Sequence, residues 1–177
     1  MMDSKYKLTL GGAVLGAFTT AAVPATAQTM DVSVTIPRVT VAEYHKPYVA
    51  LWIEQAGKPA RTINVWYDTG KKNNAGIKWL RDMRQWWRTV GRTTPTPPNG
   101  VTGATRAPGA AKISFTAGKG GMPALTAGSY TLVVEAAREG GGREVVKVPF
   151  TVSAAGTAKG SGKGSFELGA VSLTVRR

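Results

Sequence analysis

Most of the chain consists of short runs rich in β-branched and aromatic residues, and turn-forming residues bound most of these runs. In the first run, Val32, Val34 and Ile36 alternate with polar residues, and the run stops at Pro37. A period of two is typical of a strand with one buried face, and the glycine and proline residues between the runs indicate turns. The chain is therefore expected to fold mostly into short strands.

About seven of these runs are predicted to be strands. The second and third flank a Gly-Lys-Pro turn, and the fifth and sixth flank the turn Glu139–Gly142, so both pairs are expected to form hairpins. The pattern favours an all-β fold, an antiparallel immunoglobulin-like β-sandwich, with barrel closure as the alternative. The predicted strands are residues 32–36, 48–54, 62–67, 113–116, 130–137, 145–152 and 167–175.

One segment departs from the strand pattern. Residues 77–88 (IKWLRDMRQWWR) predict a single inserted amphipathic helix, because their apolar residues fall on one face at helical spacing. That face holds Trp79, Leu80, Met83, Trp86 and Trp87. Residues 93–109 are rich in proline and glycine and are predicted to be a loop. Residues 154–165, composed mostly of glycine, serine, alanine and lysine, are predicted to be a flexible surface loop.

The N-terminus has the pattern of a secretory signal peptide. Lys5 and Lys7 precede an uncharged run, which ends at Ala25-Thr26-Ala27 with the small side chains that signal peptidase accepts. A membrane anchor is the alternative, but the run is shorter than the roughly 20 residues that a span needs. Residues 1–27 are thus predicted to be removed, leaving residues 28–177 as one soluble domain in the periplasm. No later segment is apolar enough to span a bilayer.

Composition limits the chemistry of this domain. The chain has no cysteine and one histidine, His45, so disulfide chemistry and a multi-histidine zinc site are excluded. Losing Lys5, Lys7 and Asp3 changes the formal charge only from +13 to +12. Because an exported protein does not meet nucleic acid, this charge favours an acidic redox partner, an anionic envelope surface or an anionic ligand, or serves only solubility.

Residues 99–105, Asn99-Gly100-Val101-Thr102-Gly103-Ala104-Thr105, carry the most informative motif. The stretch resembles the acceptor motif of covalently flavinylated bacterial electron-transfer proteins, in which a periplasmic flavin transferase moves FMN from FAD onto a threonine or serine. The resemblance implies Thr105 as the acceptor, Thr102 as an inner hydroxyl, and Gly103 and Ala104 as small spacers. Asn99 stands where that motif has an aspartate.

The residue types suit such a reaction. Small side chains make the segment thin enough to enter an enzyme, and Arg106 is placed to offer the phosphoester a charge-assisted hydrogen bond. Trp86 and Trp87 precede the loop and are candidates to flank an isoalloxazine ring, with packing of the helix on the sheet as the favoured alternative. His45 is a weak candidate for a haem or metal ligand, and a structural role is the alternative.

Four longer blocks resemble the predicted periplasmic proteins called domain of unknown function 2271. They are His45–Glu54, Thr102–Gly109, Val134–Glu139 and Glu167–Val171. The resemblance implies an exported β-rich domain that is often found beside flavin transferases and membrane electron-transfer proteins.

Motifs of enzymes are absent from the sequence: it has no Walker loop, dinucleotide fingerprint or nucleophile elbow. The resemblance of residues 99–105 to the acceptor motif implies a periplasmic electron carrier, with FMN on Thr105, a membrane-bound electron donor and an acidic partner. A cofactor-free binding module and a haem- or metal-handling protein using His45 are the alternatives.

Overall fold

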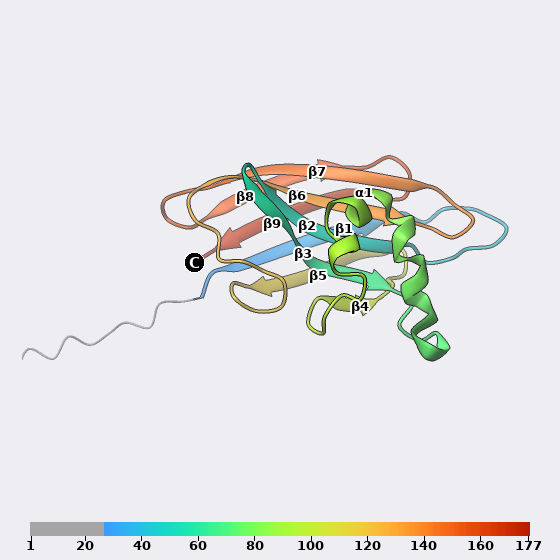
Figure 1. The fold of residues 1–177 in the computed structure, drawn as a ribbon. Coiled ribbons are helices and arrows are strands. Elements are labelled where there is room, and N and C mark those ends of the chain that lie inside the picture. Colours follow the sequence, from blue (N-terminus) through green and yellow to red (C-terminus); the bar gives the residue numbers. More distant parts are fainter. Residues whose placement is uncertain (1–26) are drawn as a thin grey trace, which may run out of the picture.

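The computed structural model describes residues 27–177. The predicted signal peptide therefore lies outside the described residues except for Ala27. The described part forms two sheets packed face to face (Figure 1), which confirms the all-β sandwich. The immunoglobulin-like detail stays a prediction.

Nine strands make up the two sheets within residues 27–177, rather than about seven. The four-stranded sheet has the order β5-β1-β9-β8 and the five-stranded sheet the order β4-β3-β2-β6-β7. All neighbours are antiparallel except β3 and β4, which are parallel. The strands are β1 (Thr29–Ile36), β2 (Tyr48–Gln55), β3 (Lys58–Tyr67), β4 (Thr102–Ala104), β5 (Gly109–Thr116), β6 (Gly128–Ala137), β7 (Arg143–Val152), β8 (Ala158–Lys163) and β9 (Ala170–Arg176).

The two additional strands lie inside the segments that were predicted to be loops, so those two predictions were wrong. Strand β4 belongs to the proline- and glycine-rich segment, and β8 belongs to the glycine- and lysine-rich one. In β8, the glycines allow a close approach: a Cβ on Gly160 would lie 2.9 Å from Val148 Cγ1, and one on Gly162 would lie 3.0 Å from Val146 Cγ1. Glycine here serves packing against β7 rather than flexibility.

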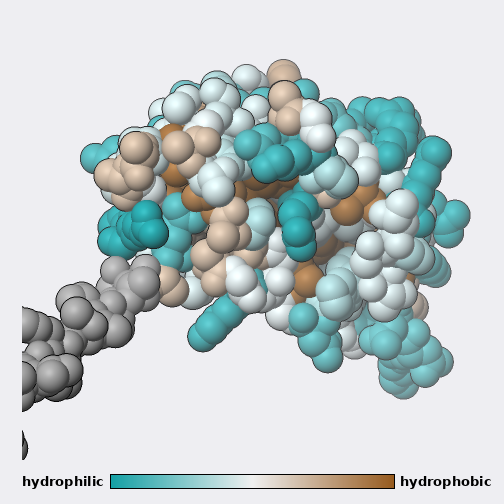
Figure 2. Space-filling view, turned by 60° about the vertical axis from the view of Figure 1, so that its left-hand side comes forward, coloured by the Kyte–Doolittle hydropathy of each residue, from teal (hydrophilic) through white to brown (hydrophobic). Residues whose placement is uncertain are grey.

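The main core lies between the sheets, where the inward residues of β1, β6, β7 and β9 meet. Strand β1 shows the predicted alternation, since Met30, Val32, Val34 and Ile36 are buried and the residues between them are half-buried. Figure 2 shows the molecule turned by 60°: apolar side chains lie recessed beneath hydrophilic residues. Burial of this kind contributes about 1.5–3 kcal/mol for each large apolar side chain.

A second core lies on the outer face of the five-stranded sheet. A helical segment covers this face (Figure 1), so strand β2 is buried on both sides and its sequence lacks strict alternation. Leu80, Met83 and Trp86 pack here on Trp52 and neighbouring residues of the sheet.

The predicted single helix over residues 77–88 is instead divided between two short pieces, and a third follows beyond residue 88. They are the 3₁₀ helix η1 (Lys72–Asp82), the α-helix α1 (Arg84–Thr89) and the 3₁₀ helix η2 (Gly91–Thr93). Met83 breaks the segment because its backbone is not helical, with φ −76° and ψ 74°. Because η1 has the three residues per turn of a 3₁₀ helix, Trp79 does not share a face with Leu80. Trp79 is 39% exposed, whereas Leu80, Met83 and Trp86 are buried as predicted.

Candidate functional site

Thr105 lies at one end of the sandwich, which we call the acceptor end. Antiparallel pairing brings the start of β2, the end of β3, the end of β6 and the start of β7 to this end, and β4 finishes there because it runs parallel to β3. The loops attached to these strand ends, with part of the helical segment, surround a pocket of about 1050 Å³, here called the end pocket. Its lining includes Tyr44, His45, Lys46, Tyr48, Asp68, Lys71, Trp79, Asp82, Arg84, Thr105, Arg138, Glu139 and Arg143.

The backbone holds Thr105 in place. Its N–H donates to the carbonyl oxygen of Tyr67 at 3.2 Å and so continues the pairing of β4 with β3. Val101, at the other end of β4, is buried, and its carbonyl accepts a hydrogen bond from Val65 N at 2.7 Å. The segment from Val101 to Ala104 is therefore ordered and contains the edge strand β4, and the half-buried Thr105 follows it into the wall of the end pocket.

Two arginines of the end pocket are bound by buried carboxylates. Arg138 Nε and Nη2 donate to the Glu167 carboxylate at 2.9 and 3.0 Å, and this bidentate hydrogen bond raises the pKa of Arg138. Arg143 Nη1 donates to Glu135 Oε1 at 3.1 Å. Glu135 is fully buried and also accepts the backbone N–H groups of Gln85 and Trp86, at 3.1 and 2.6 Å. One carboxylate thus joins the start of α1 to the pocket wall.

Three further cations of the lining form no ion pair within residues 27–177: Lys46, Lys71 and Arg84. Tyr44 adds a phenol whose oxygen is buried and has no hydrogen-bond partner among the described residues. Burial raises the pKa of Tyr44, although Arg138 opposes the shift, so the phenol stays neutral and able to donate. The lining therefore offers aromatic surface, free positive charge and an unused donor.

His45 lies at the rim of the end pocket between two carboxylates. Its Nε2 is 3.1 Å from Glu43 Oε1, and its Nδ1 is 3.9 Å from Glu139 Oε2. Across residues 27–177, no group of three or more histidine, cysteine or acidic side chains is arranged to hold a metal ion. The haem or metal role of His45 gains no further ligand from this arrangement.

The other residues of the predicted motif lie beside the pocket rather than in it. Thr102, Gly103 and Ala104 form β4 and pair with Val65, Trp66 and Tyr67. Asn99 is exposed in the turn before β4. The Arg106 guanidinium lies over the Trp66 ring, 5.5 Å from its centroid, so the structure shows a cation–π contact for this arginine.

Neither Trp86 nor Trp87 lines the end pocket. Trp86 is 1% exposed and packs in the second core, on the outer face of the five-stranded sheet. Its Nε1 donates a hydrogen bond to Thr62 Oγ1 at 2.8 Å. This placement agrees with the packing alternative. The tryptophan that does line the pocket is Trp79, which the sequence pattern had assigned to the buried helix face.

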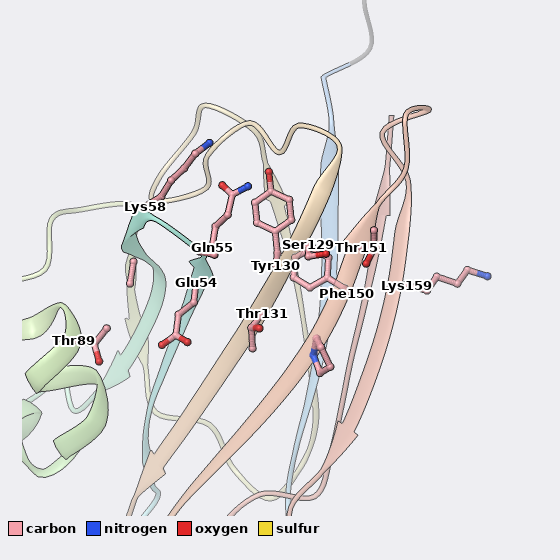
Figure 3. A pocket seen from close by; sticks show the side chains of 13 residues that line it. Glu54, Gln55, Lys58, Thr89, Ser129, Tyr130, Thr131, Phe150, Thr151 and Lys159 are labelled. Carbon is pink, nitrogen blue, oxygen red and sulfur yellow. The ribbon is translucent and has the colours of Figure 1, made fainter.

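A second pocket, of about 880 Å³, lies on the same sheet away from Thr105. Figure 3 shows Glu54, Thr131 and Thr151 among the side chains that line it, with Lys159 extending away from Thr89. Glu54 Oε1 already accepts the Trp52 indole N–H at 2.8 Å. None of the residues that the sequence predicted for a cofactor lines this pocket.

Sequence reasoning missed most of the end pocket. Tyr44, Lys46 and Tyr48 belong to one segment, and Lys71 and Arg84 come from two others that only the folded structure brings beside it. Tyr48 and Lys46 do belong to the block 45–54 that carries the family resemblance, which is the one signal that pointed toward them.

Fold and site together define a β-sandwich domain with an aromatic and cationic pocket at one end. No helix in the described part of the chain is long and apolar enough to cross a membrane. The family described as "predicted periplasmic protein (DUF2271)" matches residues 29–170, so the chain belongs to this family and is a periplasmic protein. No curated protein and no solved structure shows significant similarity to the chain.

Proposed function

We propose that the protein is a periplasmic electron carrier with FMN bound covalently to Thr105. The observation that carries the proposal is that the threonine singled out by the motif lines the end pocket. Sequence resemblance and pocket position are independent, because the motif covers seven residues of one segment and the pocket is built mainly by others.

Attachment requires the Thr105 hydroxyl to act as a nucleophile toward FAD on the transferase. The threonine oxygen forms a bond to the phosphorus of the FMN half, the pyrophosphate bond breaks, and AMP leaves. The hydroxyl proton passes to a base or to water. The half-buried Thr105 needs no adjacent base of its own in this scheme, since the transferase supplies the catalytic groups.

The residues of the end pocket fit a group that is both aromatic and anionic. Its volume of about 1050 Å³ is just above the usual range for small-molecule sites, about 300–1000 Å³. Trp79 and Tyr48 would contact a ring system, Lys46, Lys71 and Arg84 would neutralise a phosphoester, and the Tyr44 phenol would donate a hydrogen bond. When bound, FMN supplies the redox chemistry, and the protein supplies attachment, orientation and charge.

The partners follow from the same proposal. A periplasmic flavin transferase modifies Thr105, a membrane-bound donor reduces the carrier, and an acidic redox protein accepts the electrons. The formal charge of +12 without residues 1–27 favours such a partner through electrostatic steering.

Co-expression with a flavin transferase and export to the periplasm test the proposal. We expect a band that fluoresces under ultraviolet light on a denaturing gel, and a mass increase of FMN less one water on an intact chain lacking residues 1–27. An unmodified, colourless chain would falsify the carrier function and leave the cofactor-free binding module.

Variants at the two threonines of the motif locate the attachment. Thr105→Ala is expected to abolish the label, and Thr105→Ser to keep it, because serine offers the same hydroxyl. Thr102→Ala is the matched control three residues earlier, and it should leave an acceptor in place. Persistent label on Thr105→Ala would move the acceptor to another residue.

A further inference from the structure

Strand β4 has one free edge. It is the terminal strand of the five-stranded sheet, and it pairs only with β3 among the described residues. Unpaired edges present rows of N–H and C=O groups that can pair with a strand of another protein. Most proteins protect such edges, and the short length of β4 is one protection. This edge also lies directly before Thr105.

The register shows which groups face outward. Val101 O and Thr105 N bond to β3, and in a parallel pair the bonding residues alternate along the strand. Gly103 therefore faces β3 with Val101 and Thr105, whereas the N–H and C=O groups of Thr102 and Ala104 point away from it. Two donors and two acceptors are thus available along the free edge.

The segment is also held extended before any partner binds. The buried Val101 fixes its start, and the hydrogen bond from Thr105 N to Tyr67 O fixes its end. Gly103 has no side chain, and Ala104 is exposed with only a methyl group. A rigid, extended and unobstructed strand loses little conformational entropy when another strand pairs with it.

We propose that the free edge of β4 is the docking strand for the flavin transferase, which adds a strand of its own to Thr102–Ala104 and so brings its active site to Thr105. This inference rests on the proposed function. Main-chain pairing of this kind supplies affinity, and the side chains at the edge supply selectivity.

Proline at position 104 tests the main-chain contact. Ala104→Pro removes an outward N–H and keeps the bonds to β3, which edge strands tolerate. Ala104→Val is the matched control, because it adds bulk and keeps the N–H. We expect initial labelling rates, measured with purified transferase and FAD at low protein concentration, to fall roughly three- to tenfold for Ala104→Pro, as one lost hydrogen bond implies. The valine variant should label at nearly the wild-type rate.

The outcomes separate the two proposals. If the wild-type protein is not labelled, both the proposed function and this inference are wrong. A labelled wild type with an equally fast proline variant overturns the docking strand alone, and so does an equal loss in the proline and valine variants. If thermal unfolding shows that Ala104→Pro does not fold, lactic acid at position 104 by nonsense suppression replaces the N–H with an ester oxygen, and the same comparison applies.

Discussion

The carboxylate of Glu144 organises the loop between β8 and β9. It accepts hydrogen bonds from four consecutive backbone N–H groups, those of Ser165, Phe166, Glu167 and Leu168, at 2.6–3.0 Å. Burial by itself raises the pKa of Glu144, but the four hydrogen bonds together outweigh burial, so the pKa is lowered. A single side chain therefore fixes the loop that carries Glu167, the partner of Arg138.

The lowered pKa of Glu144 predicts a pH dependence of stability. The unfolded chain binds a proton more tightly than the folded one, so the contribution is fully present above the ordinary glutamate pKa and is lost as pH falls through the folded pKa. Glu144→Gln should cost about 1.5–3 kcal/mol at pH 7, as for hydrogen bonds to a charged group, and should flatten the loss of stability below about pH 5.

Urea unfolding at several pH values measures this effect. Glu139→Gln is the control, because Glu139 is exposed and within residues 27–177 its one charged contact is His45 at 3.9 Å. The control should follow the wild-type pH profile. An identical profile for Glu144→Gln would show that its carboxylate is not perturbed.

Gly121 allows the turn after β5 to approach β3. A Cβ there would overlap the Thr62 carbonyl oxygen and lie 2.9 Å from Val101 Cγ1. We expect Gly121→Ala to destabilise the protein by about 1–3 kcal/mol. Gly103→Ala is the matched substitution, since its Cβ would lie 3.4 Å from Trp66 Cδ1, an ordinary contact. Thermal unfolding of both variants checks the difference, and equal midpoints would contradict it.

At the level of the elements, β8 shows how a flexible-looking sequence can form a strand. Gly160 and Gly162 face β7, whereas Ser161, between them, is exposed. Gly160→Val should therefore separate β8 from β7 and cost about 1–3 kcal/mol, while Ser161→Val should have little effect or stabilise the strand. Denaturant unfolding of the two variants measures both changes, and a neutral Gly160→Val would mean that β8 does not pack closely on β7.

The predicted hairpins and alternating strands were found because their signals are local. Residues 48–54 and 62–67 carry β-branched and aromatic side chains on either side of a turn, and the structure pairs them as β2 and β3. Strand β4 has only Thr102 of this kind, and β8 has none. Both strands exist because of close packing or pairing with a distant strand, which no local pattern reveals. The helix was predicted from the spacing of apolar residues alone. That spacing does not reveal that the backbone of Met83 is non-helical.

The candidate site was predictable to a similar extent. Thr105 was identified from its neighbours in sequence, and it does line the end pocket. Trp79 was assigned to the core because a continuous helix would have buried it. It lies instead in a 3₁₀ helix, whose three residues per turn place it off the face of the buried Leu80, so the error in the element produced the error in the site.

At the scale of the whole molecule, the two ends of the sandwich differ. Three large hydrophobic residues are notably exposed among residues 27–177, and all belong to segments at the acceptor end: Val41 at 44%, Trp79 at 39% and Phe166 at 74%. Lys46 and Lys71 line the end pocket at the same end. Exposed apolar residues with cations beside them are typical of a surface that meets a partner protein.

This asymmetry predicts where charge affects electron exchange. For the proposed FMN carrier, Lys71→Glu should slow the reaction with an acidic redox protein, and Lys119→Glu, in the turn after β5 at the opposite end, should change it little. Both variants change the net charge equally. Stopped-flow rates at low and high ionic strength test this, since the difference should shrink as salt screens the charges. Equal slowing by both variants would indicate steering by net charge alone.

The first and last strands begin and end away from the pocket. Thr29 of β1 pairs with Arg176 of β9, whereas Val34 and Val171 pair toward the acceptor end. Figure 1 shows the C-terminus on the same side as the start of β1. A C-terminal tag would therefore attach the protein to an electrode by the end of the sandwich opposite the acceptor end. Thr105 and the end pocket would then face the solution and stay accessible to soluble partners. Direct electron transfer between the end pocket and the electrode would instead require attachment through the loop that carries Phe166, at the acceptor end.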